Sequence, residues 1–152
     1  MNTARLLTSV LVGAVACGTT DLTRDSSPLS FSILEGDYLE SPPPPQIVLM
    51  LRTETEYPCS NYRLVSELSV TGNVIQVSVS HRVTKPTVCD DAIGPAGFRA
   101  ALPNAVGTYT LELARDGVTD RYSVAITRTE IAITTLEAQF THPTALAFPR
   151  AN

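Results

Sequence analysis

The fold of this chain is decided by residues 62–83, which read YRLVSELSVTGNVIQVSVSHRV. Apolar and polar residues alternate over 62–71 and again over 74–83, and the dipeptide Gly72-Asn73 separates the two runs. Alternation with a period of two is the pattern of a half-buried β-strand, and a dipeptide of this type between two such runs signals a two-residue hairpin loop. The stretch therefore predicts a long antiparallel β-hairpin.

The same alternation predicts the register of this hairpin. With Gly72-Asn73 as the loop, the large apolar side chains gather on one face, and a slip by one residue would mix the two faces. The expected pairs on the apolar face are Val70 with Ile75, Leu68 with Val77, Ser66 with Val79, Leu64 with His81 and Tyr62 with Val83. The expected pairs on the other face are Ser69 with Gln76, Glu67 with Ser78 and Arg63 with Arg82.

A second hairpin is predicted around Asp116-Gly117, a strong turn signal. Further strands are expected over 29–35, 47–53, 98–102 and 130–134, and no segment has a sustained helical period. About seven or eight short strands separated by turn signals predict an all-β fold, an antiparallel β-sandwich. The expected pairs of the second hairpin are Leu111 with Tyr122, Tyr109 with Val124 and Glu112 with Arg121.

Over residues 29–135 this pattern resembles the immunoglobulin-like sandwich of many exported bacterial modules. The resemblance implies two antiparallel sheets packed face to face. The sequence departs from true immunoglobulin domains because it contains no Trp. Its cysteines would also lie at the end of one hairpin instead of bridging the two sheets.

The N-terminus has the pattern of a secretory signal peptide. Arg5 is followed by an apolar run over 6–16 that is too short to cross a bilayer permanently. The run ends in Ala14-Val15-Ala16-Cys17, which resembles the lipobox of bacterial lipoproteins, although that family more often has Leu at the first of these positions. The resemblance implies cleavage before Cys17 and its acylation by diacylglycerol and palmitate. Gly18, where that family has Asp for inner-membrane retention, implies the outer membrane if the host is Gram-negative.

The predicted organisation follows from these segments. It comprises a signal peptide over 1–16, a lipidated tether over 17–28, the β-sandwich over 29–135 and a C-terminal edge strand or tail over 136–152. The alternative at the N-terminus is ordinary signal cleavage nearby, which would leave Cys17 as a free thiol.

The two remaining cysteines, Cys59 and Cys89, form an even pair. In an exported chain such a pair predicts a disulfide more strongly than a metal site. The hairpin register places Cys59 opposite Pro86, three residues from Cys89, so a small curl of the chain would join the two sulfurs. Two free buried thiols are the alternative.

Composition and motifs argue against several function classes. With 11 Lys and Arg against 15 Asp and Glu, the net charge of −4 provides no basic field for a nucleic acid. The chain has no Gly-x-Ser-x-Gly motif, and His81 and His142 lack metal-ligand spacing. Asp90-Asp91 could contribute to a calcium loop, but nothing supplies the six to eight oxygens that Ca²⁺ needs. We therefore expect no enzyme activity, no metal and no cofactor.

Arg63 and Arg82 are an anomaly in the predicted hairpin, because like charges directly opposite each other destabilise a sheet. Either Glu67 or another nearby carboxylate relieves them, or they mark a contact with an anion such as a phosphate or an acidic partner.

These features predict a non-enzymatic lipoprotein of the bacterial cell envelope. It would be bound to the membrane through its N-terminal lipid, and its β-domain would present loops or an edge strand to a protein or envelope component. The alternative is a secreted or periplasmic inhibitor of proteases, with the loop at 94–97 or the stiff run Pro42–Pro45 as its wedge. A third hypothesis, a hydrolase, would need a pocket that gathers His81 with carboxylates.

Overall fold

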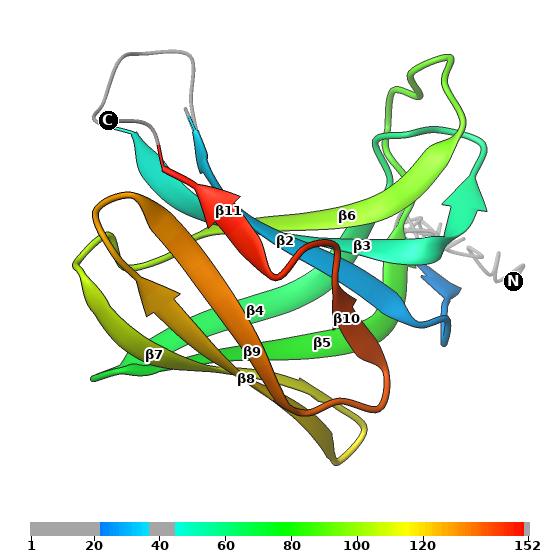
Figure 1. Ribbon diagram of the computed structural model, residues 1–152. Coiled ribbons are helices and arrows are strands. Elements are labelled where there is room, and N and C mark those ends of the chain that lie inside the picture. The colour runs from blue at the N-terminus through cyan, green and yellow to red at the C-terminus, as the bar shows by residue number, and fades with distance from the viewer. Residues whose placement is uncertain (1–21, 37–44, 151–152) are drawn as a thin grey trace, which may run out of the picture.

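A computed structural model describes residues 22–36 and 45–150, and Figure 1 shows that these form strands and loops but no helix. The prediction of an all-β fold is confirmed. No helix that could span a membrane is found in the described residues. The signal peptide, the lipobox and Pro42 to Pro44 lie outside them. The strands are β1 (Leu22–Arg24), β2 (Leu29–Gly36), β3 (Gln46–Tyr57), β4 (Arg63–Thr71), β5 (Val74–Thr84), β6 (Gly94–Ala101), β7 (Gly107–Arg115), β8 (Val118–Ile126), β9 (Glu130–Glu137), β10 (Thr141–Pro143) and β11 (Ala147–Pro149).

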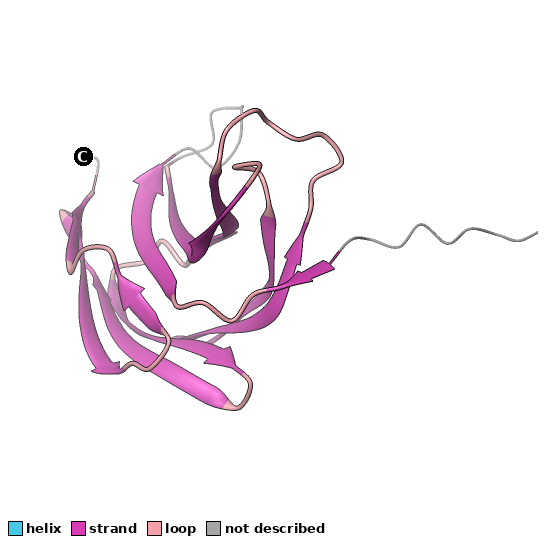
Figure 2. Cartoon of the chain, turned by 90° about the vertical axis from the view of Figure 1, so that its right-hand side faces the viewer, coloured by secondary structure: helices cyan, strands magenta, loops and turns pink. Residues whose placement is uncertain are grey.

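The strands form one mixed sheet in the order β10-β2-β3-β6-β4-β5-β7-β8-β9-β11, with β1 paired to β5. This sheet curls into a half-barrel (Figures 1 and 2). The predicted two-sheet, immunoglobulin-like sandwich is not confirmed, because β6 and β4 remain joined at Arg63 and Gly97. The sheet is also not purely antiparallel, since β10 runs parallel to β2, β4 to β6, and β5 to β7.

The β7–β8 hairpin has the predicted register, with Leu111 opposite Tyr122 and Glu112 opposite Arg121. Its two loop residues, Asp116 and Gly117, both have positive φ values of 53° and 80°. This backbone is that of a type I′ turn, which suits the twist of antiparallel strands and favours Asp-Gly. Local sequence is therefore sufficient to specify this hairpin.

The β4–β5 hairpin has the predicted register only near its turn, from Ser66–Val79 to Val70–Ile75. The register shifts beyond Ser66, so that Leu64 lies opposite Val83 and Arg63 opposite Thr84. The predicted pairs Leu64–His81, Arg63–Arg82 and Tyr62–Val83 are therefore wrong. The reason is a bulge in β5, where three residues, 80–82, stand against the single residue 65 of β4.

The hydrophobic core lies on the concave face of the curled sheet. Phe31 of β2 meets Tyr122 of β8 edge to face, with ring centroids 4.8 Å apart. This contact joins strands from the two halves of the sheet. The largest fully buried side chains are Leu29, Phe31, Ile33, Ile47, Leu49, Leu51, Ile75, Leu111, Leu113, Tyr122, Ile126 and Ile131.

The segments before and after the predicted domain are part of the fold. Residues 22–24, expected in the tether, form β1, and the stretch after 136 forms β10 beside β2 and β11 beside β9. The C-terminal stretch thus extends both ends of the sheet. Arg150 ties it to β2 through an ion pair with Glu35 at 2.7 Å.

Candidate binding surface

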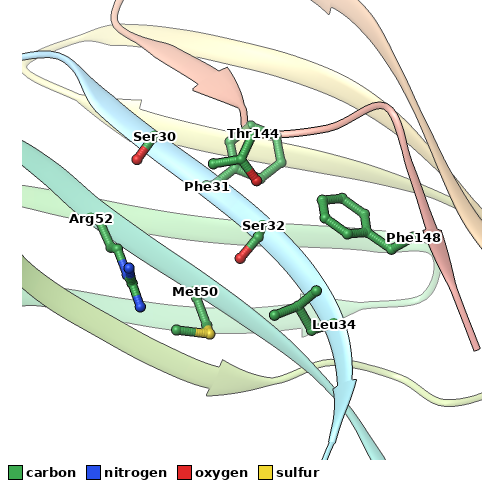
Figure 3. A pocket seen from close by; sticks show the side chains of 8 residues that line it. All are labelled: Ser30, Phe31, Ser32, Leu34, Met50, Arg52, Thr144 and Phe148. Carbon is green, nitrogen blue, oxygen red and sulfur yellow. The ribbon is translucent and has the colours of Figure 1, made fainter. Parts of the chain in front are cut away.

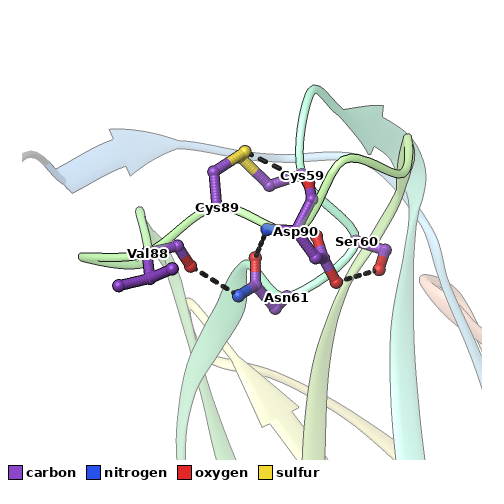
Figure 4. Close-up of a disulfide and its surroundings, with 6 residues drawn as sticks. All are labelled: Cys59, Ser60, Asn61, Val88, Cys89 and Asp90. Carbon is purple, nitrogen blue, oxygen red and sulfur yellow. Dashed lines mark hydrogen bonds between the residues drawn. A yellow bond between two sulfur atoms is a disulfide. The ribbon is translucent and has the colours of Figure 1, made fainter.

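A disulfide joins Cys59 and Cys89 at one end of the half-barrel, and the predicted bridge is thereby confirmed. The two Cα atoms are 5.4 Å apart, and 30 positions separate the residues in the sequence. Figure 4 shows the hydrogen bonds around the bridge, in which Asn61 Nδ2 donates to the Val88 carbonyl at 2.8 Å and Ser60 Oγ to Asp90 Oδ2 at 2.5 Å. These contacts hold the segment 85–93 against the segment 58–62.

The braced segment 85–93 exposes two apolar side chains. Val88 is 77% and Ile93 73% exposed, the highest values among the large apolar side chains of the described residues. Single exposed apolar residues are ordinary on a protein surface, but a covalently braced loop presents them with little loss of conformational entropy on binding. This loop, which we call the disulfide loop, is a candidate contact site.

The prediction that residues 94–97 form an exposed loop is wrong, because these residues lie in β6 and pair with β3. Gly94 is buried, and a Cβ atom on it would stand 2.9 Å from the Cβ of Ser60. Gly94 thus allows close backbone packing, and residues 94–97 are not an exposed loop. Of the run Pro42–Pro45, only Pro45 is described.

Strand β1 and residues 25–27, which together we call the strap, are bound to the same end of the molecule. Leu22 pairs with Thr84 at the end of β5, directly before the disulfide loop, and the Asp25 N–H donates to the His81 carbonyl at 2.6 Å. The Asp25 carboxylate is largely buried and accepts hydrogen bonds from Tyr57 Oη at 2.5 Å and the Ser27 N–H at 2.6 Å. These bonds determine where the chain preceding Leu22 leaves the domain.

Asp25 makes the strap sensitive to acid. Burial by itself raises the pKa of Asp25, but the hydrogen bonds from Tyr57 and Ser27 outweigh it and hold the pKa below its ordinary value. A lowered pKa in the folded state stabilises the fold at pH values above the unfolded pKa of about 4, and that contribution is lost as the pH falls through the folded value.

We therefore expect Tyr57→Phe to lower the free energy of unfolding at neutral pH by about 1 to 3 kcal/mol, because it removes a hydrogen bond to a buried carboxylate. The loss of stability below about pH 4 should also be smaller in this variant than in the wild type. Urea unfolding between pH 7 and pH 2 measures both effects. Tyr109→Phe, which removes a hydroxyl that donates to the Ala105 carbonyl and to no carboxylate, is the control and should leave the shape of the pH profile unchanged. Parallel pH profiles for wild type and Tyr57→Phe would contradict the assigned role.

His81 does meet a carboxylate, as the hydrolase hypothesis required. Its Nε2 contacts Asp116, and its Nδ1 lies 3.2 Å from the Asp25 carbonyl oxygen. Both ring nitrogens thus face acceptors, and no hydroxyl or thiol among the described side chains hydrogen-bonds to this ring. The ring joins the β7–β8 turn to the strap, which is a structural arrangement with no nucleophile in it.

The other predicted site residues, His142 and Asp90-Asp91, do not come together in one site. His142 faces Glu54 at 3.8 Å with both side chains about half exposed. Asp90 is bonded to Ser60, and within residues 22–36 and 45–150 no group of three His, Cys, Asp or Glu side chains could hold a metal ion. Asp90-Asp91 is a solvent-exposed part of the disulfide loop.

Arg82 has a different neighbour from the predicted one. It lies opposite Arg24 of β1, and both side chains are exposed. Arg63 is opposite Thr84, and Glu67, the carboxylate expected to relieve it, is opposite Ser78. The sequence could not indicate Arg24, because residues 22–24 have too short an alternation to predict a strand.

A shallow pocket of about 260 Å³ lies on the outer side of β2 and β3 (Figure 3). Its one charged lining side chain is Arg52, so it gathers no acid and base for catalysis. It was not predicted, because the C-terminal stretch that forms one wall was assigned no position. The lining residues are Ser30, Phe31, Ser32, Leu34, Met50, Arg52, Thr144 and Phe148.

Comparison with known proteins does not assign a function to this arrangement. No protein-family model, curated protein or solved structure matches the chain.

Proposed function

We propose that this chain is a non-enzymatic lipoprotein of the bacterial cell envelope. Cys17, acylated after removal of residues 1–16, would anchor it, and the outer membrane is the destination in a Gram-negative host. The β-domain would present the disulfide loop to a protein or envelope component.

The observation that supports export is the disulfide between Cys59 and Cys89. Disulfides persist in oxidising compartments such as the bacterial periplasm and the cell surface, and they are rare in the reducing cytosol. The bridge thus agrees with the compartment implied by the signal-like residues 1–16. Two acyl chains would hold the protein stably at a membrane, whereas one gives only marginal binding.

The position of β1 limits the length of the segment that would tether the domain to the acylated Cys17. Because β1 begins at Leu22, only residues 18–21 separate it from Cys17. Five extended residue steps reach at most about 17 Å. The domain would therefore sit close to the bilayer, with the disulfide end near it.

The intact mass of the protein from the membrane fraction of a bacterial host tests this proposal. The sample is alkylated at free thiols without reduction. We expect a chain that begins at Cys17, is heavier by the acyl groups and carries no label at Cys59 or Cys89. Reduction before alkylation should add two labels, and Cys17→Ser should abolish acylation while leaving the disulfide intact. A soluble, unacylated wild-type chain would overturn the proposal.

A secreted protease inhibitor remains the second candidate, because the disulfide loop exposes Val88 and Ile93 in a braced conformation. This candidate predicts inhibition of at least one protease in a panel. Ile93→Ser should weaken that inhibition at least tenfold, whereas Val106→Ser, an equally apolar exposed change in the β6–β7 loop, should not. Absence of inhibition across serine, cysteine and metalloproteases would remove it.

A further inference from the structure

Two arginines stand directly opposite each other beside the point where the N-terminal segment leaves the domain. Arg24 of β1 and Arg82 of β5 are cross-strand partners, so their side chains project from the same face of the sheet. Val83, between Arg82 and Thr84, is fully buried, which shows that Arg82 projects from the outer, convex face. Arg63 lies opposite Thr84 and projects from that face as well. We call these three side chains the arginine cluster.

The arginine cluster has no carboxylate partner in the described part of the chain. No Asp or Glu described by the structure lies within ion-pair distance of Arg24, Arg63 or Arg82, and all three are exposed. Like charges opposite each other in a sheet are unfavourable unless an anion lies between them. The nearby carboxylate side chain that the sequence offered as one explanation for Arg63 and Arg82 is thus not found among the described residues.

Acidic side chains on the same outer face lie nearer the Gly72-Asn73 turn. Glu67 is opposite Ser78, and Glu112 accepts hydrogen bonds from Gln76 at 3.0 Å and from Arg121 at 3.2 Å. Among the paired residues of β1, β4 and β5, this face is therefore basic beside the N-terminal strand, and the exposed carboxylates at that end, Asp90 and Asp91, belong to the disulfide loop.

The position of the cluster relative to Cys17 indicates which surface this is. Arg24 follows Cys17 by seven positions, and the four residues 18–21 cannot carry Leu22 beyond about 17 Å from an acylated Cys17. Leu22 is itself 44% exposed on the same face. Guanidinium groups bind phosphate oxygens through paired, charge-assisted hydrogen bonds.

We propose that the arginine cluster docks on the phosphate groups of anionic lipids in the bilayer that carries the Cys17 anchor. This inference rests on the proposed function, since it takes Cys17 to be acylated. Docking would place the outer face of β1, β4 and β5 against the headgroups. Each arginine near an anionic membrane is expected to shift the ratio of docked to undocked protein about fivefold.

The test uses the full acylated chain in nanodiscs of phosphatidylcholine, with or without phosphatidylglycerol, and with a headgroup-chelated gadolinium lipid. Broadening of backbone amide NMR signals reports distance from the headgroups. We expect the amides of Arg24, Arg63 and Arg82 to broaden strongly in discs with phosphatidylglycerol and much less in phosphatidylcholine alone. The amide of Gly72, in the turn at the opposite end of the β4–β5 hairpin from Arg63, serves as an internal reference.

Charge reversal supplies the control. Arg24→Glu/Arg82→Glu should remove the dependence on phosphatidylglycerol, whereas Arg52→Glu/Arg128→Glu, with the same change in net charge elsewhere on the surface, should keep it. Arg82→Gln alone should reduce the docked fraction about fivefold. Amide spectra of the variants that overlay on the wild type away from the mutations verify folding.

The outcomes separate the two proposals. An acylated chain whose broadening is the same in both lipid mixtures, or unaffected by Arg24→Glu/Arg82→Glu, overturns the docking of the cluster and leaves the lipoprotein proposal standing. A chain without acyl groups that does not associate with phosphatidylcholine discs overturns the proposed function and this inference together.

Discussion

Replacing Asp120 with alanine should lower the free energy of unfolding by at least about 3 kcal/mol. Asp120 is fully buried, and its carboxylate accepts hydrogen bonds from the backbone N–H groups of Gln139 at 2.8 Å, Phe140 at 3.0 Å and Thr141 at 2.7 Å. The Thr141 hydroxyl donates a fourth at 2.6 Å. Removing the carboxylate would leave these donors without acceptors in a buried site, which costs more than the bonds themselves contribute.

The effect should be structural as well as energetic, because Asp120 holds the turn that leads from β9 into β10. Tyr122 Oη, from the same strand, also donates to the Thr141 carbonyl at 2.8 Å. Loss of the hydrogen bonds to Asp120 should release β10 from β2. Amide hydrogen exchange over 139–144 should therefore accelerate more than exchange in the β4–β5 hairpin.

Chemical denaturation measures the stability change. Asp91→Ala, an exposed carboxylate on the disulfide loop, is the matched control and should stay within about 0.5 kcal/mol of the wild type. Asp120→Asn should cost less than alanine, because the amide oxygen can still accept the three hydrogen bonds from Phe140 and Thr141, and its NH₂ group would then face only the Gln139 N–H. If Asp120→Ala lowers the free energy of unfolding by less than about 1 kcal/mol, the stabilising role of the Asp120 carboxylate is contradicted.

Removing the disulfide by Cys59→Ala/Cys89→Ala should lower the free energy of unfolding by about 3 to 4 kcal/mol, since the bridge closes a loop of 30 positions. The cost arises mainly because the unfolded chain regains conformational freedom. The disulfide loop should also become more susceptible to proteolysis, because only the exposed hydrogen bonds of Ser60 and Asn61 would then hold it.

The wild type under reductant provides the control for this prediction. Dithiothreitol should lower the stability of the wild type to that of the double variant and should leave the double variant unchanged. If reductant affects both proteins equally, or neither, the stabilisation does not come from the bridge.

The hairpins and the disulfide could be predicted because their determinants are close in sequence. Asp116-Gly117 selects its turn through backbone conformation alone, and the alternation on either side aligns the strands. The bulge in β5 could not be predicted in this way. It preserves the alternation of inward and outward side chains, so the periodic pattern of 74–84 shows no irregularity.

The candidate surfaces were predictable only in part. Cys59 and Cys89 follow from the hairpin, but the pairing of Arg82 with Arg24 depends on a three-residue strand that has no pattern of its own. The strap of Asp25 and Tyr57 joins residues 32 positions apart, and only the folded chain brings them into contact.

The sequence by itself therefore determined the all-β class, the two hairpins near their turns and the disulfide, because each depends on spacing within one segment. The tertiary structure decided the curled single sheet, the incorporation of 22–24 and of the C-terminal stretch, and the arginine cluster. These depend on which edge of the sheet a distant segment joins. Hydrogen bonds at sheet edges are much the same for any sequence, so this choice follows from the packing of the whole chain.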